Sequence, residues 1–472
     1  MKIRRILALL VGVVLLVGGS ATSASAAETV IVRLRLGGSL SLITRVLGGT
    51  VLDEIPEART YLLSVPLLPP TWLWLPGIDF IEPNEILLLP GVLESAILTG
   101  SDSTAADWYA GQPSLRVVRS REAQAHARGG GVVVADIDSR FDFSHPALRG
   151  HFGGGYDFVA ENEAREAGLD QSSASFMFGE DGLLDQSSAS FMFGEDGLLD
   201  QSSASFMFGE NGLLDQSSAS FLFDENGLRI LSPFRRILDP PSVAYSHGTL
   251  TAGLIAVTAP DATIMPIRAF NDEGEADLFT LAKSVRYAAK NGAHVINMSW
   301  GTLTDSRALR QAIQFAANRG IVLVTSAGNM NDDVTVYPAV YPGVVAVAAT
   351  DDHDRKAEFS NYGRHIDVDA PGVNVISAYP GGYYSLASGT SFSSPIVAGQ
   401  AALVRSVLPS GVESRIGDTA VKIDDINWRY AGQLGTGRVD MLGAVRAGEP
   451  ATQPASDSQS QGGLLGGLLG GW

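Results

Sequence analysis

The chain of 472 residues carries 51 acidic and 33 basic side chains, giving a formal net charge of −18, and it contains no cysteine. The acidic balance argues against nucleic acid as a partner, because binding to phosphates requires a basic surface. The lack of cysteine excludes disulfides, thiolate metal sites and a cysteine nucleophile. A chain of this length is expected to form about two to three domains.

Residues 1–26 have the pattern of a secretory signal peptide. Lys2, Arg4 and Arg5 precede an apolar run over residues 6–17, and Ala24-Ser25-Ala26 offers a cleavage site. The apolar run is shorter than the ~20 residues that a membrane span needs. We therefore expect a secreted protein (extracellular, at the cell surface or periplasmic) with no transmembrane segment once the signal is removed.

Residues 27–100 are expected to form a small α+β domain. Four strand-like runs and two helical segments follow one another in the order β-α-β-β-α-β. These are the strands 29–36, 50–55, 60–65 and 78–84 and the helical segments 39–47 and 69–75. The polar stretch 101–112 is typical of a linker, so residues 101–128 should lead into the next domain.

Residues 129–447 predict an α/β domain with a mostly parallel central sheet. Gly129–Gly131 precede a strand rich in β-branched residues, which ends at Asp136 and Asp138. Further strands and helices then alternate. Ligands bind at the carboxyl ends of strands in such sheets, so both carboxylates are site candidates. The alternative is that they only form a turn. The later strands are 263–267, 295–301, 321–324 and 344–347, and the helices between them are 278–291 and 306–318.

A tandem repeat interrupts this domain. Asp-Gln-Ser-Ser-Ala-Ser-Phe recurs at Asp170, Asp185, Asp200 and Asp215, a period of 15 residues. The insertion over residues 168–227 is expected to be a stack of hairpins or a flexible surface loop. A calcium-binding or adhesive array is the alternative. Beyond the domain, residues 448–472 form a low-complexity tail rich in Ser, Gln and Gly.

Two segments of small and apolar residues predict buried helices that begin with reactive side chains. His247 opens one, and Gly389-Thr390-Ser391 opens the other, with Pro395 expected in its first turn. A hydroxyl at a helix start lies beside unpaired backbone N–H groups, where an oxyanion would be stabilised. The alternative is that Thr390 or Ser391 only caps the helix. An Asp, a His and a Ser in this order are the parts that acyl transfer needs.

The motifs resemble those of subtilases, the subtilisin-like serine endopeptidases of the peptidase S8 type. Residues 389–395 resemble the family's nucleophile motif and residues 247–253 its histidine motif. Residues 325–329 resemble the segment that ends in the oxyanion asparagine, and residues 296–301 the strand that pairs with substrate. Residues 369–372 and 435–440 also match, so the resemblance covers about residues 105–446. The α/β-hydrolase elbow Gly-x-Ser-x-Gly is absent at Ser391, and His247 and Asn329 argue against sedolisins, which have Glu and Asp there.

This resemblance implies a role for each matching residue within a three-layer subtilisin-like fold. Ser391 would attack the peptide bond, His247 would act as base and then acid, and Asp138 would orient the imidazole. Asn329 and the backbone N–H of Ser391 would bind the oxyanion. Substrate-binding positions would be Ser299, Trp300, Gly301, Ala327, Gly328 and Val336. Because many relatives have Gly where Val336 stands, we expect Ala, Leu or Met, not Phe or Tyr, before the cleaved bond.

Several positions depart from the family pattern. Asp138 takes the catalytic place because His145-Pro146 lies seven residues after it. Arg140 then replaces a Gly, and Asp136 replaces an apolar residue, so one of the two neighbouring carboxyls should have a raised pKa. The alternative function is therefore a catalytically impaired subtilase-fold binding or surface adhesion protein that acts through its repeats. Ala147 replaces an Asp that often binds calcium, so we assign no metal ligand and no cofactor, and any calcium site is unknown.

Residues 27–100 resemble the inhibitor I9-like propeptide of subtilases, with residues 77–84 as its closing strand. The resemblance implies a zymogen whose propeptide is an intramolecular chaperone and inhibitor. Such a protein would cut its own linker, here between about Leu93 and Tyr109. The expected partners are protein or peptide substrates and the chain's own propeptide.

Overall fold

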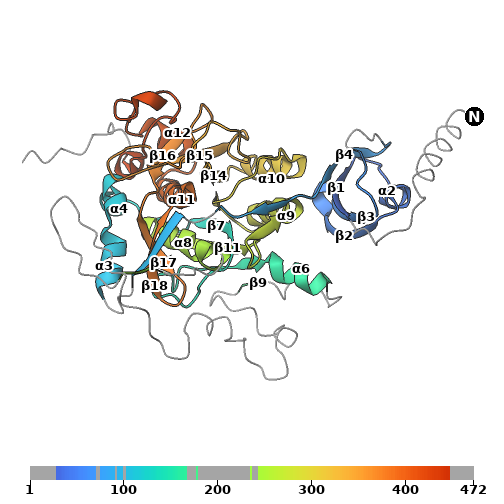
Figure 1. The fold of residues 1–472 in the computed structure, drawn as a ribbon, viewed down its shortest axis with the longest axis horizontal. Coiled ribbons are helices and arrows are strands. Elements are labelled where there is room, and N and C mark those ends of the chain that lie inside the picture. The colour runs from blue at the N-terminus through green and yellow to red at the C-terminus, as the bar shows by residue number, and fades with distance from the viewer. Residues whose placement is uncertain are drawn as a thin grey trace, which may run out of the picture. The chain divides into compact units, whose positions relative to one another are not determined.

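The computed structural model describes residues 28–70, 75–90, 93–98, 103–166, 177–178, 234–236 and 243–446 (Figure 1). The expected signal peptide, the C-terminal tail and all of the repeats except residues 177–178 lie outside the described residues. The chain divides between Asn84 and Glu85 into two compact units. Within the described part, no helix has both the length and the apolar character needed to cross a bilayer.

The first unit is an antiparallel sheet of four strands, in the order β2-β3-β1-β4, with one helix packed on it. Ser39 caps helix α2 by accepting the N–H of Leu42, and Gly48 ends the helix with a positive φ of 66°. The expected helical segment 69–75 includes residues 71–74, which lie outside the described residues. The elements are β1 (Glu28–Leu34), α2 (Leu40–Leu47), β2 (Thr50–Ile55), η1 (Pro56–Ala58), β3 (Thr60–Val65) and β4 (Ile78–Pro83).

The second unit is built on an eight-stranded sheet in the order β16-β15-β14-β13-β7-β11-β8-β9. All neighbouring strands are parallel except the edge pair β8–β9. This confirms the expected mostly parallel sheet. Strand β9 belongs to the first repeat copy. The strands are β7 (Val133–Asp138), β8 (Gly155–Asp157), β9 (Met177–Phe178), β11 (Thr263–Arg268), β13 (Val295–Met298), β14 (Val322–Ser326), β15 (Val344–Thr350) and β16 (Val368–Pro371).

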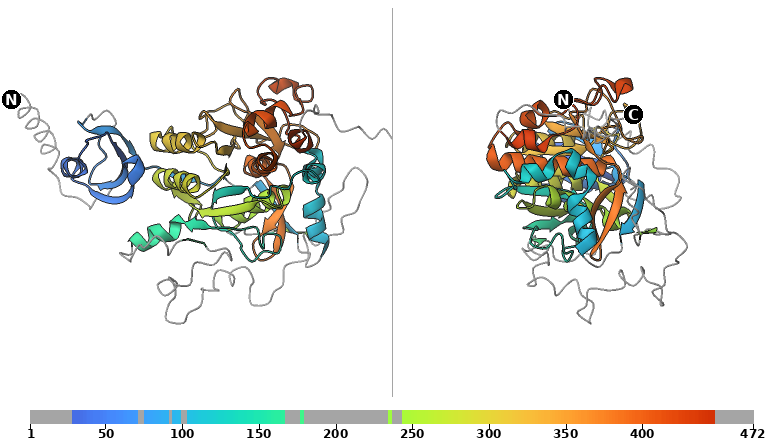
Figure 2. Two further views of the ribbon diagram at one scale, coloured as in Figure 1. Left: turned by 180° about the vertical axis from the view of Figure 1, so that it is seen from behind. Right: turned by 90° about the vertical axis from the view of Figure 1, so that its left-hand side faces the viewer.

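Helices cover both faces of this sheet. Helices α8 and α11 pack on one face and bury its main core, while α9 and α10 pack on the other (Figures 1 and 2). The helices are α3 (Ser103–Gly111), α4 (Pro113–Val117), α5 (Ser120–Gln124), α6 (Phe158–Glu166), α8 (Val243–Thr258), α9 (Leu278–Lys290), α10 (Arg307–Ala317), α11 (Thr390–Val407), α12 (Val412–Asp418), η4 (Trp428–Tyr430) and α13 (Met441–Val445).

Residues 85–98, expected in the first block, belong to the second unit. Strand β5 (Ile86–Leu88) pairs with β12 (Glu275–Asp277), and β6 (Leu93–Leu98) pairs with β18 (Tyr383–Ser388). A four-stranded antiparallel sheet in the order β10-β6-β18-β17 results. Its remaining strands are β10 (Phe234–Arg236) and β17 (Val375–Tyr379). The first block is therefore shorter than expected, because two strands of its last segment find their partners elsewhere.

Three local expectations were wrong. The linker over residues 101–112 contains helix α3, because Tyr109 is buried and donates its hydroxyl hydrogen to the carbonyl of Gly253. Helix α8 begins at Val243, so His247 is not its first residue. Pro395 lies in the second turn of α11, because that helix already begins at Thr390.

Helices α5 and α13 join the two ends of the second unit. Arg119, at the N-cap of α5, donates from Nε to Oδ1 of Asp440 over 2.8 Å. Asp440 caps α13, and the N–H of Met441 donates to the carbonyl of Val118 over 3.0 Å. The ion pair links residues that lie 321 positions apart in the chain.

Candidate active site

Asp138 and His247 form a buried pair where β7 ends beside α8. The Nδ1 atom of His247 lies 2.8 Å from each carboxyl oxygen of Asp138, and neither side chain is exposed. A carboxylate at this distance holds the ring hydrogen on Nδ1, which leaves Nε2 as the proton acceptor. The structure therefore pairs Asp138, and not Asp136, with the imidazole.

The residue after His247 has to be small. A Cβ atom on Gly248 would lie 2.6 Å from the carbonyl oxygen of Arg140, in the loop that follows β7. The Arg140 guanidinium is engaged by Asp272, with two hydrogen bonds of 2.6 Å. The loop therefore approaches helix α8 through the Arg140 backbone, while Asp272 takes up the charge of the Arg140 side chain.

Ser391 is the second residue of α11, and its side chain is buried. Its hydroxyl donates to the carbonyl of Ser299 over 3.1 Å. Among the described residues, Nε2 of His247 has no hydrogen-bond partner. The imidazole contacts the ring of Phe392, the next residue, with 5.7 Å between ring centroids. The structure therefore brings the imidazole beside the start of α11, with the Ser391 hydroxyl turned to Ser299.

Pro395 explains a contact that sequence reasoning missed. Because proline has no N–H, the carbonyl of Ser391 lacks its usual donor four residues later in the helix. The hydroxyl of Ser299 donates to that carbonyl over 2.8 Å instead. Ser299, expected only as a substrate-binding residue, thus also supports the first turn of α11. The position of Pro395, four residues after Ser391, was the signal available in the sequence.

Asn329 follows β14 and lies against the same helix start. Its Oδ1 atom accepts hydrogen bonds from the N–H and the hydroxyl of Thr390, over 2.9 and 2.8 Å. The Nδ2 group therefore points away from Thr390 and is available as a donor. The N–H of Ser391 belongs to the first turn of α11 and has no acceptor within the helix. Two N–H donors thus lie at one helix start, where the sequence led us to expect the oxyanion to bind.

Two of the remaining expected substrate positions, Gly301 and Gly328, lie against the buried Val336. Trp300 is buried and donates its indole N–H to the carbonyl of Ile137 over 2.9 Å. Cβ atoms built on Gly301 and Gly328 would lie 2.6 and 3.3 Å from methyl groups of Val336. Ala327 is buried as well. Val336 therefore fills the space between the segments that end β13 and β14.

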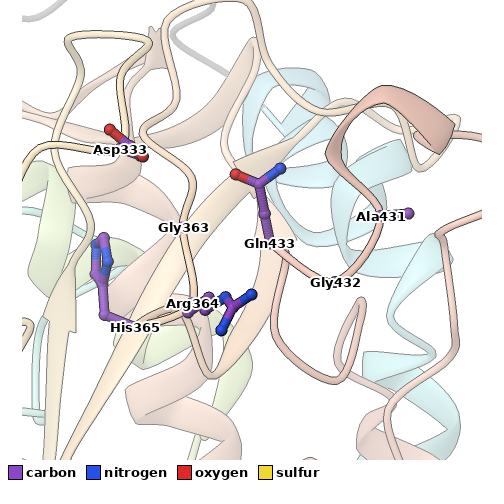
Figure 3. Close-up of a pocket in the computed structure, with 7 residues that line it drawn as sticks. All are labelled: Asp333, Gly363, Arg364, His365, Ala431, Gly432 and Gln433. Atoms are coloured by element: carbon purple, nitrogen blue, oxygen red, sulfur yellow. The ribbon is translucent and has the colours of Figure 1, made fainter.

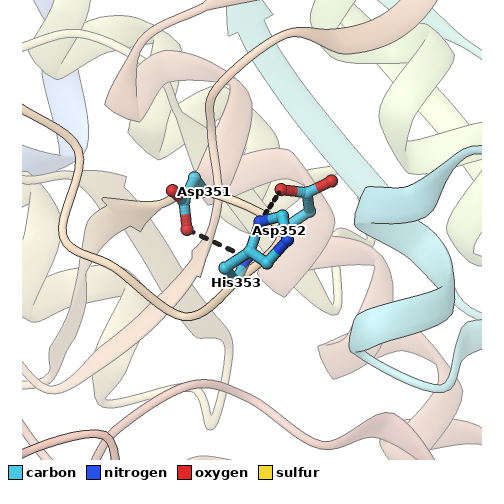
Figure 4. Close-up of side chains that lie close together, drawn as sticks. All are labelled: Asp351, Asp352 and His353. Carbon is cyan, nitrogen blue, oxygen red and sulfur yellow. Dashed lines mark hydrogen bonds and ion pairs between the residues drawn. The ribbon is translucent and has the colours of Figure 1, made fainter. Parts of the chain in front are cut away.

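Two other polar features involve none of these residues. A pocket of about 680 Å³ is lined by Asp333, Gly363, Arg364, His365, Ala431, Gly432 and Gln433, none of which was expected at the site (Figure 3). Asp351, Asp352 and His353 hold possible metal-ligand atoms within 4.8 Å of one another (Figure 4). Asp351 accepts the backbone N–H groups of His353 and Arg355, which is the bonding of an ordinary turn. This group gives no ground for a calcium site.

A protein-family model described as "Subtilase family" matches residues 129–424. The chain belongs to the subtilase family. The chain is 40% identical over 205 residues to a thermostable alkaline protease of Halalkalibacterium halodurans, covering 41% of this chain and 57% of that relative. It is 38% identical over 218 residues to thermitase of Thermoactinomyces vulgaris, covering 44% of this chain and 77% of thermitase. The chain thus spans little more than half of the first of these relatives.

The fold of this subtilase is also that of a solved structure. Fervidolysin from Fervidobacterium pennivorans, described as a keratinolytic enzyme related to subtilisin, superimposes with a TM-score of 0.63 at 22% identity. The match covers 93% of this chain and 63% of fervidolysin. At this identity the likeness establishes the subtilisin-like fold, which agrees with the fold expected from the sequence.

Proposed function

We propose that this subtilase is a secreted serine endopeptidase, made as a zymogen, that cleaves peptide bonds with Asp138, His247 and Ser391. The observation that carries the proposal is the fully buried His247–Asp138 pair, whose free Nε2 atom lies beside the helix that begins at Thr390. Family membership supports the same reaction, since the relatives described above are proteases.

The proposed reaction follows from these contacts. The Ser391 hydroxyl turns from the Ser299 carbonyl to Nε2 of His247, which takes its proton as the oxygen attacks the peptide carbonyl. Asp138 stabilises the imidazolium, while Nδ2 of Asn329 and the N–H of Ser391 hold the oxyanion. His247 then gives the proton to the leaving amine, and water hydrolyses the acyl-enzyme. The buried Val336 supports a shallow pocket that accepts Ala, Leu or Met.

A fluorophosphonate probe tests this proposal, because it labels a serine only when a neighbouring base activates the hydroxyl. The full-length protein, collected from the culture medium, is expected to be labelled at Ser391 and to hydrolyse a peptide library. His247→Ala should abolish both. A folded protein that takes no label would favour the alternative, a catalytically impaired binding or adhesion protein that acts through its repeats.

Strand β5 supports the zymogen part of the proposal. It adds to β12 as an antiparallel strand, and the N–H of Leu89 donates to the carbonyl of Gly274 over 2.8 Å. The side chains of Leu87 and Leu89 are only 4% and 7% exposed, whereas Leu88 is 64% exposed. This is how a protease holds an extended peptide, with backbone pairing and alternate side chains in pockets. The chain's own segment thus takes the place of a substrate.

The strand pairings also favour a position for self-cleavage. After β5, strand β6 pairs with β18, with Leu93 opposite Ser388. Strand β18 leads through Gly389 directly to Ser391. The peptide bond that is cut should therefore lie between Leu89 and Leu93. This is closer to the N-terminus than the stretch after Leu93 that the sequence suggested.

Intact-mass measurement of the secreted protein checks this prediction. The wild type should begin between Pro90 and Leu93, and Ser391→Ala should keep the preceding block. Leu87→Glu should slow the cut, because the Leu87 side chain is buried, while Leu88→Glu, at an exposed position of the same strand, is its matched control. Identical N-termini in wild type and Ser391→Ala would instead point to an outside protease or a permanent domain.

A further inference from the structure

The proposed reaction leaves one buried acid without a role. Asp136 lies two residues before Asp138 on β7, and both side chains are fully buried. Its Oδ2 atom lies 2.8 Å from the hydroxyl of Thr251 on α8, and its Oδ1 atom lies 2.8 Å from Nδ2 of Asn297 on β13. Burying a charged carboxylate at such a site costs free energy. The protonation state of Asp136 therefore decides whether its side chain can donate a hydrogen bond or only accept one.

Thr251 lies between the two acids. Its hydroxyl oxygen is 2.8 Å from Asp136 Oδ2, 3.5 Å from Asp138 Oδ2 and 3.0 Å from the carbonyl of Gly248. A hydroxyl has a single hydrogen to donate. If both acids were ionised, that hydrogen would be shared among three acceptors. If Asp136 is a carboxylic acid, it donates to Thr251 and leaves the threonine hydrogen for Gly248 or Asp138.

The other oxygen of Asp136 leads to the start of α11. The Nδ2 group of Asn297 donates to Asp136 Oδ1 and to the hydroxyl of Ser299, over 2.8 and 3.0 Å. Asn297 Oδ1 accepts the hydroxyl hydrogen of Ser394 over 2.9 Å. Ser299 in turn supports the carbonyl of Ser391. Asp136 therefore connects the strand that carries Asp138 with the turn that carries the nucleophile.

The surroundings of Asp136 favour its neutral form. Burial, and secondarily the nearby Asp138 charge, raise the pKa of the Asp136 carboxyl well above its ordinary value, against the smaller effects of Asn297 and Thr251. In register with it on the neighbouring strands are Pro266 of β11 and Asn297 of β13, neither of which carries charge. The ionisable group whose charge acts on Asp136 is Asp138, which is itself paired with His247.

We propose that Asp136 is a positioning residue, held as a neutral carboxylic acid, that fixes Thr251 and Asn297 and through them Asp138 and the first turn of α11. This inference rests on the proposed function, because it concerns the residues assigned to proton transfer. Asparagine can replace the acid in this role, since its NH₂ can donate to Thr251 while its oxygen accepts from Asn297. Valine has a similar size and can do neither.

Kinetics of two variants test the role. Asp136→Val should lower kcat by about 10- to 100-fold with little change in KM, because the catalytic groups lose their alignment. Asp136→Asn should recover most of that loss and leave the acidic limb of the kcat/KM profile within ~0.2 pH units. If Asp136 were ionised, Asp136→Asn would remove a negative charge near His247 and move that limb downward by about half a unit or more. Such a shift would overturn the proposal.

An infrared measurement tests the neutral acid without any activity. It uses Ser391→Ala protein, so that no self-digestion occurs. At neutral pH we expect a C=O band of a protonated carboxyl that shifts in D₂O and disappears in Ser391→Ala/Asp136→Asn. A missing band would refute this inference even if the protein is an active protease. If the band is present but the wild-type protein takes no fluorophosphonate label, the proposed function alone would be refuted.

Thermal unfolding in the same Ser391→Ala background provides an independent check. The unfolded chain releases the Asp136 proton near the ordinary pKa, while the folded protein keeps it. The stability contributed by the neutral acid is therefore complete at low pH and decreases as pH rises. The Tm of Ser391→Ala/Asp136→Asn should therefore rise relative to the Tm of Ser391→Ala as the pH is raised from 4 to 8. A constant difference in Tm would contradict a raised pKa.

Discussion

Replacing Ser391 by alanine is expected to lower kcat for a peptide amide by about 10⁶-fold, a magnitude taken from subtilisin itself. Without the hydroxyl, His247 has no nucleophile to activate, and no acyl-enzyme can form. The proposed oxyanion donors, Asn329 and the backbone at residue 391, should remain in place and assist only the slow attack of water. Steady-state hydrolysis by wild type and variant, purified separately to exclude carry-over, measures the effect.

Ser393→Ala is the matched control for this substitution. Ser393 lies on the same helix and is buried, and its hydroxyl has no hydrogen-bond partner among the described residues. We expect this variant to keep its activity within a few-fold, since the same hydroxyl-to-hydrogen change there removes no hydrogen bond. Comparable losses in both variants would mean that the helix, and not the Ser391 hydroxyl, is what the reaction needs.

Asp138→Asn should lower kcat by about 10⁴-fold at neutral pH. The present carboxylate accepts the hydrogen on Nδ1 of His247 through contacts of 2.8 Å. An asparagine amide would donate to Nδ1 and so place the ring hydrogen on Nε2, which could then no longer accept the Ser391 proton. The pH dependence of kcat/KM for wild type and variant measures this loss.

Asp136→Asn tests the same assignment from the neighbouring position. It makes the same chemical change on the same face of β7, yet its effect should be far smaller, because Asp136 contacts Thr251 and Asn297 and not the imidazole. If Asp136→Asn were the more damaging change, Asp136 and not Asp138 would be the carboxylate that the reaction needs. Circular dichroism of both variants would confirm that they fold.

Periodicity was sufficient to predict the mostly parallel character of the central sheet and five of its eight strands, but not β8, β9 and β16. The β-branched runs that became β7, β13, β14 and β15, with amphipathic segments between them, indicate buried parallel strands joined by helices. These strand and helix patterns are local in the sequence, so a single chain is enough to recognise them. The pairing of Asp138 with His247, 109 positions away, was instead implied by the resemblance to subtilases, and the spacing to His145 only selected Asp138 over Asp136.

The features that the sequence did not reveal depend on distant partners. A polar stretch became helix α3 because Tyr109 packs near Gly253, and residues 86–98 joined strands near 276 and 385. The short runs in these segments do not indicate which edge they will meet. Likewise, the bonding of Asp136 depends on Thr251 and Asn297, which lie 115 and 161 positions away. Such pairings are set by tertiary packing and not by propensity.

The link between Arg119 and Asp440 bears on how the protein is made. Helix α5 emerges early from the ribosome, whereas its partner α13 is the last described helix of the chain. At about 5–20 residues per second, the intervening 321 positions take on the order of 15 to 60 seconds to synthesise. During that interval the face of α5 that packs against α13 has no partner. Closure of the second unit therefore has to wait until Asp440 has been synthesised, and a nascent chain halted before Asp440 should remain open to proteolysis.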